Sequence, residues 1–454
     1  MGQPLVKQGR GKQLRRPKAT VLYHYFYPDD VVSARHYDDL CKGLVARGWE
    51  VEAMPCMRGC RDERQVYPQR DTWCGVEIRR VWRPRFRQAS NLGRLLNACW
   101  MILAWSLLLV TRSQRRLPDV LVVGTDPILS VLVGWVVKRF RPAVRIVHWC
   151  FDLYPEAPIA EGMLKESSIG GYIVKRLVRA AYRSCDLLVD IGGCMRRVLA
   201  RYNSPARQVT LVPWALSEPD RMIDPDVETR RELFGDAALG LLYSGNFGRA
   251  HSYEELLELA RSLRGEPIHF CFAVRGNQAA ELRAAVRADD VNVSFAGFAP
   301  ESVLAKRLAA ADIHMASLRP SWTGVVVPSK FFGSLAAGRP ILFAGSRDAA
   351  IAQWIFQYGV GWVLDRDTLP KIAQELRWLA RAKERLRALQ RRCYDAYHAQ
   401  FSLCRTMDCW DRELRALLTL PARASSTEAE PRTNGSLSHR PLRSSTGERQ
   451  SVSV

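Results

Sequence analysis

Two glycine-bearing segments in the second half of the chain carry residues suited to binding an anion. One reads YSGNFGRAH over residues 243–251, and the other reads TGVVVPSK over residues 323–330. Glycine lets backbone amides approach a phosphate closely, and a helix that begins just beyond adds partial positive charge. Arg249 and Lys330 supply cations, and proline before Ser-Lys fits a helix start. The pair predicts a phosphate or diphosphate site, while each segment alone also fits a plain strand-to-helix turn.

The first half of the chain offers polar side chains that can face the same site. His148 ends the apolar run VRIVHW, where it can hydrogen-bond a sugar hydroxyl or serve as a structural donor. Asp152 follows it and fits either a site residue or a helix N-cap. Ser33, Arg35 and His36 follow YFYPDD, where they fit either an acceptor contact or an ordinary first helical turn.

The elements that must position these residues form an alternating pattern along the chain. Short runs rich in Val, Ile and Leu are followed by amphipathic stretches, which is typical of parallel strands covered by helices. The thirteen runs are Thr20–Phe26, Glu50–Met54, Val76–Val81, Asp119–Val123, Val144–His148, Leu187–Ile191, Gln208–Val212, Leu239–Tyr243, Ile268–Val274, Val291–Phe295, Ile313–Ala316, Pro340–Phe343 and Gly361–Val363. Ligands of such sheets bind beyond the carboxyl ends of the strands, which is where the candidate residues stand.

Thirteen strands exceed one open sheet of usual size, so the chain is expected to form two domains. Residues 214–226 show neither helical nor strand periodicity and are expected to separate them. The predicted fold class is α/β, with two doubly wound Rossmann-like domains facing a central cleft. The expected divisions are 1–18 (disordered basic arm), 19–215 (acceptor-binding domain), 216–395 (donor-binding domain), 396–420 (helix returning to the first domain) and 421–454 (disordered tail).

Composition narrows the partners and the compartment. The 454 residues include 67 Lys and Arg against 46 Asp and Glu, a formal charge of +21, so an anionic partner is expected. No basic helix with interleaved aromatic residues is visible, so nucleic acid is not expected as a partner. The 12 cysteines are scattered and fit no zinc spacing, and the first 20 residues lack a signal-peptide core. Free thiols in a reducing, cytoplasmic interior are therefore expected.

One segment complicates a purely soluble interpretation. Residues 95–110 read LLNACWMILAWSLLLV, followed by Arg112, Arg115 and Arg116. Sixteen residues fall short of the about 20 that a spanning helix needs. A buried core helix and an interfacial helix that dips its tryptophans into lipid both remain open, with a membrane span as a third reading.

At the level of whole motifs, the sequence resembles the retaining GT-B glycosyltransferases. Within them it is similar to the bacterial branch that makes exopolysaccharide or O-antigen precursors, such as the colanic-acid-type and fucosaminyl transferases. The resemblance covers residues 19–415 and is carried by YFYPDD, HWCFDLYPE, YSGNFGRAH and VVPSKFFGSLAAGRP. The wider superfamily carries two glutamates eight residues apart near the last stretch, where this sequence has Val325 and Gly333. The second of those glutamates normally binds ribose hydroxyls, so that contact is expected to differ.

The resemblance implies roles for individual residues. His148, Asp152, Arg249 and Lys330 are assigned to catalysis, the two cations holding the leaving diphosphate and His148 positioning the donor sugar or the acceptor. Ser33 and Arg35 are assigned to the acceptor side. Donor-binding roles are assigned to Gly245, Asn246, Phe247, Gly248, His251, Arg275, Gly276, Phe298, Val327, Pro328 and Ser329.

The implied function is retaining transfer of a sugar from a nucleotide-sugar, with UDP as first choice. The expected acceptor is a saccharide or a polyprenyl-diphosphate-linked saccharide in cell-surface polysaccharide synthesis. No cofactor and no metal ligand set are expected, and the enzyme is expected to lie peripherally on the inner face of the cytoplasmic membrane. Two alternatives remain: a catalytically inactive GT-B scaffold, favoured by the missing glutamates, and a GT-B-type epimerase.

Overall fold

The computed structural model describes residues 15–420 apart from residues 30, 89 and 300. The expected disordered tail and most of the expected basic arm lie outside these residues. The last part of the arm is not disordered, because the first strand begins at Lys18 and Arg15 pairs with Asp119 at 2.6 Å. Arg15 is thus held by an ion pair beside the starts of the central strands β1 (Lys18–Leu22) and β5 (Val120–Val123), which the spacing in sequence does not reveal.

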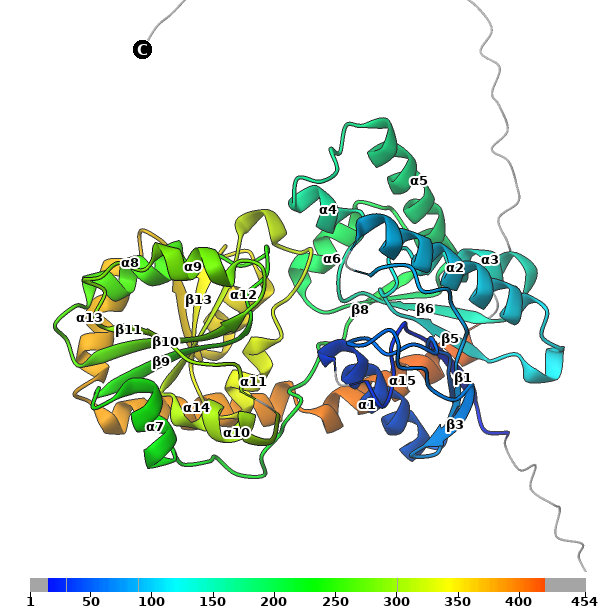
Figure 1. Ribbon diagram of the computed structural model, residues 1–454. Helices are drawn as coiled ribbons and strands as arrows, with labels where there is room; N and C mark the ends of the chain where they lie inside the picture. Colours follow the sequence, from blue (N-terminus) through cyan, green and yellow to red (C-terminus); the bar gives the residue numbers. More distant parts are fainter. Residues whose placement is uncertain (1–14, 30, 89, 300, 421–454) are drawn as a thin grey trace, which may run out of the picture. The chain divides into compact units, whose positions relative to one another are not determined.

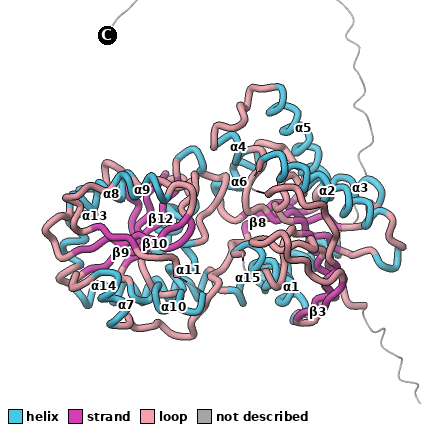
Figure 2. The backbone as a smooth tube through the Cα atoms, viewed as in Figure 1, coloured by secondary structure: helices cyan, strands magenta, loops and turns pink. Residues whose placement is uncertain are grey.

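The N-terminal domain is built on an eight-stranded sheet in the order β3-β4-β2-β1-β5-β6-β7-β8 (Figures 1 and 2). All neighbouring pairs are parallel except β3 with β4. The central strands are buried along their whole length, as expected for a parallel sheet covered on both faces. In sheet order the strands are β3 (Arg70–Trp73), β4 (Val76–Arg79), β2 (Glu50–Ala53), β1 (Lys18–Leu22), β5 (Val120–Val123), β6 (Arg145–Trp149), β7 (Leu187–Asp190) and β8 (Arg207–Thr210).

Helices cover both faces of this sheet. In Figure 1, α2, α3 and α5 lie on one side and α1 lies on the other. The helix α3 contacts both α2 and α5, so these three form one continuous layer. The helices are α1 (Val32–Ala46), α2 (Asn91–Val110), α3 (Val131–Phe140), α4 (Glu156–Ala160), α5 (Ile169–Ser184) and α6 (Gly193–Ala200), with a 3₁₀ turn η1 (Gln114–Arg116).

The C-terminal domain has a six-stranded, all-parallel sheet in the order β11-β10-β9-β12-β13-β14. Its strands are β11 (Val293–Phe295), β10 (Ile268–Arg275), β9 (Leu239–Asn246), β12 (Ile313–Leu318), β13 (Ile341–Gly345) and β14 (Gly361–Leu364). Its helices are α7 (Val227–Phe234), α8 (Glu254–Ser262), α9 (Ala279–Ala285), α10 (Glu301–Ala310), α11 (Lys330–Ala336), α12 (Ala350–Tyr358), α13 (Leu369–Leu379) and α14 (Lys383–Gln400), with a 3₁₀ turn η2 (Pro320–Trp322).

The expected α/β architecture with two parallel sheets is confirmed, and each of the thirteen apolar runs overlaps a strand. The fourteenth strand, β3, was not predicted. Its sequence RDTW has no apolar alternation, and it pairs antiparallel at the sheet edge, where one polar face meets water. No helix or strand lies between Thr210 and Val227, where the sequence places the domain boundary.

The chain returns to the N-terminal domain through two helices, where one was expected. The expected start of the returning segment, residue 396, lies inside α14, which packs against α11 in the C-terminal domain. The crossing comes at residues 401–402, after which α15 (Leu403–Thr419) lies against α1. There Trp410 packs on Trp149 with ring centroids 4.9 Å apart. Trp49 Nε1 donates to Asp411 at 2.6 Å, which fixes α15 to the first domain.

Candidate active site

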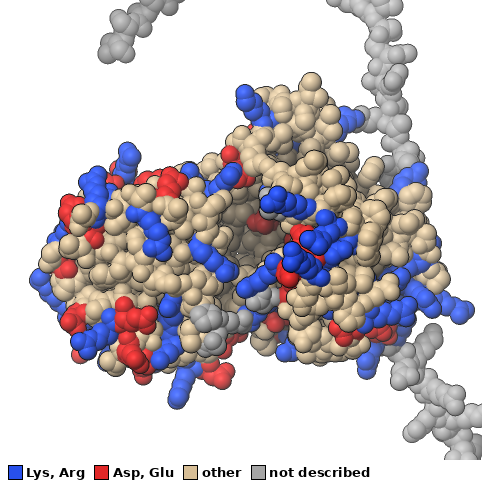
Figure 3. All heavy atoms as spheres, in the orientation of Figure 1, with Lys and Arg blue, Asp and Glu red and all other residues tan. Residues whose placement is uncertain are grey.

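A cavity of about 790 Å³ lies beyond the carboxyl ends of strands from both sheets. Figure 3 shows the surface hollowed between the two domains, with Lys and Arg side chains near the rim. Most predicted site residues meet here. Those that line the cavity are Arg35, Asp152, Gly245, Asn246, Gly248, Arg249, His251, Arg275, Phe298, Val327, Pro328, Ser329 and Lys330. The fold therefore brings the two glycine-bearing segments to one place.

Lys330 joins these two segments directly. It is the first residue of α11, and its Nζ donates to the backbone oxygen of Asn246 at 2.9 Å. Gly245 has φ +126, and a Cβ built there would lie 3.1 Å from Lys330 Cε. Glycine is therefore needed both for the backbone and for the close approach of the lysine. Burial lowers the pKa of Lys330 to about 8, so the ammonium stays largely charged at pH 7.

His251 is a neutral hydrogen-bonding group in this site. Its Nδ1 lies 2.7 Å from the Ser317 carbonyl oxygen, to which it must donate. Burial, followed by the charge of Lys330, lowers the pKa of His251 to about 3. The imidazole of His251 therefore carries no charge at pH 7. The free Nε2 carries a lone pair and can accept a hydrogen bond.

Arg249 is engaged across the two domains. Its guanidinium lies 2.5 Å from Glu161 Oε1, and the arginine side chain is about half exposed. Glu161 is the residue that ends α4, and it lines the same cavity. Sequence reasoning missed Glu161, since it lies in an irregular stretch without a motif. An anion that binds Arg249 must compete with this carboxylate.

An aromatic surface borders the C-terminal side of the cavity. Phe298 is 46% exposed, and the Arg275 guanidinium stacks 3.7 Å above its ring centroid. Both residues follow strands of the second sheet and line the cavity. A flat cation-aromatic pair of this kind offers a stacking surface to a planar ring such as a nucleobase.

Phe247 and Gly276 pack inside the C-terminal domain and do not line the cavity. Phe247 is fully buried, with its ring 5.0 Å from Tyr243 and 5.6 Å from His251. Gly276 has φ +127, and a Cβ there would lie 2.6 Å from the Phe247 backbone oxygen. The buried ring of Phe247 thus packs beneath the loop at residues 245–249. Gly276, which has no side chain, leaves room for the Phe247 backbone.

His148 also lies outside the large cavity, contrary to the expectation from its place near a strand end. It is buried, and its Nδ1 lies 2.9 Å from the Val123 backbone oxygen on the neighbouring strand. Burial lowers the pKa of His148 to about 4, so the imidazole is neutral. Because β6 continues to Trp149, His148 belongs to the body of the sheet.

Asp152 is the acidic group that reaches the cavity from this side. Burial, followed by the nearby charge of Asp126, raises the pKa of Asp152 to about 6. It also lines a small adjoining cavity with His148. The alternative of a helix N-cap is not observed, because Pro155 precedes α4.

Of the two residues predicted for the acceptor side, one lines the cavity and the other does not. Arg35 lines the cavity and donates to the Leu216 backbone oxygen at 3.4 Å, whereas Ser33, a described residue, does not line it. His36 is buried, with Nε2 3.0 Å from the Trp214 oxygen and Nδ1 2.8 Å from the Val32 oxygen. Ser33 lies within the first turn of α1, so the reading as a first helical turn holds for it.

The segment before α11 completes the cavity wall. Ser329 is exposed at the start of α11, and its side chain makes no capping bond. Gly333 lines the cavity with nothing within 4 Å of a built Cβ, while Val325 is buried and faces elsewhere. The position of the usual ribose-binding glutamate is therefore open space. Among the described residues, no group of three His, Cys, Asp or Glu gathers to hold a metal ion.

One protein family matches the N-terminal part of the chain. Residues 33–215 match the family described as the glycosyl transferase 4-like domain. The match begins in α1 and ends in the segment after β8, so it spans nearly all of the N-terminal domain.

Two bacterial relatives align with a large part of the chain. WbjE of Pseudomonas aeruginosa, named as a probable glycosyltransferase, is 28% identical over 62% of this chain and 70% of its own length. WcaI of Escherichia coli K12, named for a glycosyl transferase of colanic acid biosynthesis, is 25% identical over 57% of this chain and 65% of its own length.

Solved structures share the fold over nearly the whole described chain. Sucrose-phosphate synthase from Thermosynechococcus elongatus superposes with a TM-score of 0.66 at 15% identity, covering 88% of this chain and 100% of that one. Anabaena HepE, solved with UDP and glucose, superposes with a TM-score of 0.61 at 10% identity and the same coverage. Residues 33–215 thus match the glycosyl transferase 4-like domain, and the described chain has the two-domain GT-B fold that its solved neighbours share.

Proposed function

We propose that this protein is a retaining glycosyltransferase that moves a sugar from a UDP-linked donor to a saccharide or polyprenyl-diphosphate-linked acceptor during cell-surface polysaccharide synthesis. The observation that carries the proposal is the contact between the two anion-binding segments. Lys330 Nζ and the loop at residues 245–249 meet at one cavity that both domains line. This places a cation, backbone amides and Arg249 around one volume large enough for a nucleotide-sugar.

Retention requires the acceptor hydroxyl to attack the anomeric carbon from the face that the leaving group vacates. The acceptor oxygen forms the new bond, the old bond from carbon to phosphate oxygen breaks, and the nucleoside diphosphate leaves with its electron pair. The hydroxyl proton passes to the departing diphosphate. Lys330 and Arg249 stabilise the charge that develops on the diphosphate, and neutral His251 accepts a hydrogen bond from the sugar.

UDP as the donor nucleotide is supported by two observations. The stacked Arg275–Phe298 pair offers a surface for a base at the edge of the cavity. A fold neighbour, HepE, was solved with UDP bound. With Gly333 in place of a carboxylate, the ribose is bound by other groups, and the loop around Asn277 lines the same cavity.

A calorimetric screen of UDP-, GDP- and ADP-sugars tests the proposed donor. We expect one nucleotide class, UDP, to bind with a dissociation constant of about 1 μM to 1 mM, the range usual for enzyme substrates. Product analysis by NMR then reports the anomeric configuration. Inversion would reject the retaining mechanism, and tighter binding of GDP- or ADP-sugars would reject UDP.

Attachment to an anionic membrane surface is part of this proposal and is supported by α2. The helix has 20 residues and a mean hydropathy of 1.6, long and apolar enough to cross a membrane by those criteria alone. Such helices also occur in soluble cores. Here one side is anchored in the fold: Trp105 is fully buried, and its Nε1 donates to the Met54 oxygen at 2.8 Å.

The outer side of α2 is the unusual one. Leu92, Leu103 and Leu107 are 67%, 65% and 61% exposed. The polar residues Asn97 and Ser106 point inward and are buried. The rest of the buried side is mostly apolar, so apolar side chains lie on both sides of α2, unlike the usual amphipathic arrangement of a surface helix. The half-buried, half-exposed state favours an interfacial helix over the core and spanning alternatives.

Replacing outer leucines with acid tests this surface. We expect Leu103→Glu/Leu107→Glu to reduce binding to phosphatidylglycerol-containing vesicles about ten-fold, because two apolar contacts are lost and like charge is added. Cosedimentation measures the bound fraction. The matched control, Val227→Glu/Val291→Glu, changes two exposed valines of the C-terminal domain and should bind as the unaltered protein does. Equal binding by both variants, or none by the unaltered protein, would contradict the membrane proposal.

A further inference from the structure

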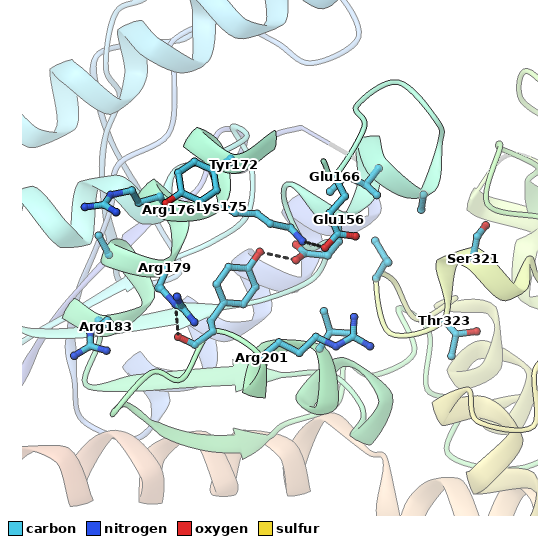
Figure 4. Close-up of a pocket in the computed structure, with 16 residues that line it drawn as sticks. Glu156, Glu166, Tyr172, Lys175, Arg176, Arg179, Arg183, Arg201, Ser321 and Thr323 are labelled. Atoms are coloured by element: carbon cyan, nitrogen blue, oxygen red, sulfur yellow. Dashed lines mark hydrogen bonds and ion pairs between the residues drawn. The ribbon is translucent and has the colours of Figure 1, made fainter. Parts of the chain in front are cut away.

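A second cavity, of about 920 Å³, lies in the N-terminal domain and is called here the α5 pocket. Its walls come from α4, α5 and the end of α6, and from residues 321–325 of the C-terminal domain (Figure 4). Neither the donor site nor the assigned acceptor residues use it. Its volume is sufficient for a diphosphate and part of an attached group.

Cations dominate the lining of the α5 pocket. Five cationic and two acidic side chains give it a formal balance of +3. The cations are Lys175, Arg176, Arg179, Arg183 and Arg201. On α5, three of the arginines are three and four residues apart, which puts them on one helical side.

Both acidic groups of the pocket are already engaged. Glu166 pairs with Lys175, and Glu156 accepts from the Tyr202 hydroxyl at 2.5 Å. Within the described part of the chain, no carboxylate lies at ion-pair distance from Arg176, Arg183 or Arg201. In Figure 4, Ser321 and Thr323 lie across the pocket from α5, where their hydroxyls add polar groups. The pocket is therefore suited to an anion with more than one charge.

The rest of the exposed side of α5 is apolar. Ile169, Tyr172 and Ile173 are 81%, 64% and 50% exposed, and Tyr172 also lines the pocket. A helix whose outer side contacts only water usually carries polar side chains there. The helix α3, which packs against both α5 and α2, exposes two further large apolar side chains, Trp135 and Phe140. An amphiphile with an anionic head and an apolar chain matches both halves of the surface.

The α5 pocket and the donor cavity share a wall. Along residues 321–327, Ser321, Thr323 and Val325 face the α5 pocket, whereas Trp322, Val326 and Val327 face the donor cavity. The short helix α4 behaves in the same way. Its Glu156 and Ile159 line the α5 pocket, and Glu161 at its end lines the donor cavity. A head group bound in the first cavity can thus extend its sugar toward the second.

We propose that the α5 pocket binds the diphosphate of an isoprenoid-diphosphate-linked acceptor, an inference that rests on the proposed function. Arg176, Arg179, Arg183 and Arg201 hold the diphosphate, while the exposed side chains of α5 contact the isoprenoid chain. The acceptor sugar reaches the donor cavity past residues 321–327. Specificity for a lipid-linked acceptor then depends on residues more than 40 positions before the donor loop.

Calorimetry with four soluble probes tests the pocket in the full-length protein: farnesyl diphosphate, farnesol, inorganic pyrophosphate and dioctanoyl-phosphatidylglycerol. We expect farnesyl diphosphate to bind more tightly than the other three. We expect Arg176→Gln/Arg183→Gln to weaken its binding about ten-fold through loss of two charge-assisted contacts. The matched control is Arg387→Gln/Arg391→Gln, which removes two exposed arginines from α14. That control should bind farnesyl diphosphate unchanged.

Each other result overturns part or all of the proposal. If farnesol binds as tightly as farnesyl diphosphate, the diphosphate charge does not contribute to binding. If pyrophosphate binds as tightly, the isoprenoid chain does not contribute. Equal affinity for the phosphatidylglycerol shows a general phospholipid site. Unchanged farnesyl diphosphate binding in Arg176→Gln/Arg183→Gln rejects the pocket. Binding of UDP-sugar is read out separately: if it is absent while farnesyl diphosphate binding still depends on these arginines, the proposed function fails and the pocket stands.

Discussion

Replacing Lys330 with alanine is expected to lower kcat/KM for the donor by about 100-fold to 1,000-fold, the range seen when one group that stabilises a developing oxyanion is removed. The lysine is the only described cation whose ammonium bonds to the donor loop, at 2.9 Å from the Asn246 oxygen. Its loss leaves the leaving diphosphate without this charge. The measurement is a steady-state assay with donor varied, using Lys371→Ala, an exposed lysine on α13, as the matched control.

The same side chain sets a pH dependence. Because burial lowers the pKa of Lys330 to about 8, the free enzyme loses this cation as pH rises through 8. The value of kcat/KM for the donor should therefore fall on the alkaline side of pH 8, since this parameter reports the free enzyme. Lys330→Ala should lack this fall. A full alkaline fall in Lys330→Ala, or activity equal to that of Lys371→Ala, would rule out the assigned role.

Arg249 and Glu161 are expected to respond in opposite directions. Arg249→Ala removes a guanidinium from the donor cavity and should weaken kcat/KM by about 100-fold. Glu161→Gln removes the carboxylate that lies 2.5 Å from this guanidinium and lets it turn fully to the diphosphate. Donor affinity should then rise by about two-fold to five-fold, as expected from removing one partly exposed ion pair.

Calorimetry of donor binding to the two single variants and the double variant measures this coupling. In Arg249→Ala, the further change Glu161→Gln should have little effect, because its carboxylate no longer competes for the arginine. If both single variants weaken donor binding to the same extent, the pair serves only to hold the domains together. Arg249 would then lose its place in the donor site.

Hydrophobic runs predicted the strands well because the central strands of both sheets are buried along all or most of their length. Strands of a parallel sheet are apolar on both faces, so they read as continuous runs. The exception, β3, is polar and lies at the sheet edge, so only its pairing with β4 reveals it. The meeting of the two glycine-bearing segments at one cavity was also predictable, since both follow strands of the same parallel sheet.

What the sequence could not supply was the depth and direction of individual side chains. The sequence places both His148 and Asp152 near the end of one strand, but β6 extends one residue past His148 and keeps it inside the sheet, whereas Asp152 follows the strand. Phe247 lies between two loop glycines, and its ring is buried in the core. The motif alone does not predict this burial. Glu161 meets Arg249 only because the two domains approach each other.

The helix α2 shows a further limit. Its polar residues, Asn97 and Ser106, would be assigned to the outer side by periodicity alone. The structure buries both and turns leucines outward. The apolar composition of this helix therefore does not show which of its sides packs on the core.

The central claim is that one anion-binding cavity between the two domains holds a nucleotide-sugar through Lys330 and Arg249. Calorimetric titration of the unaltered protein, Lys330→Ala and Arg249→Ala with UDP-sugars tests this most directly. The account predicts one donor bound per chain, with affinity strongly reduced in both variants. Binding that is unchanged in both variants, or no nucleotide-sugar binding to the unaltered protein, would contradict it.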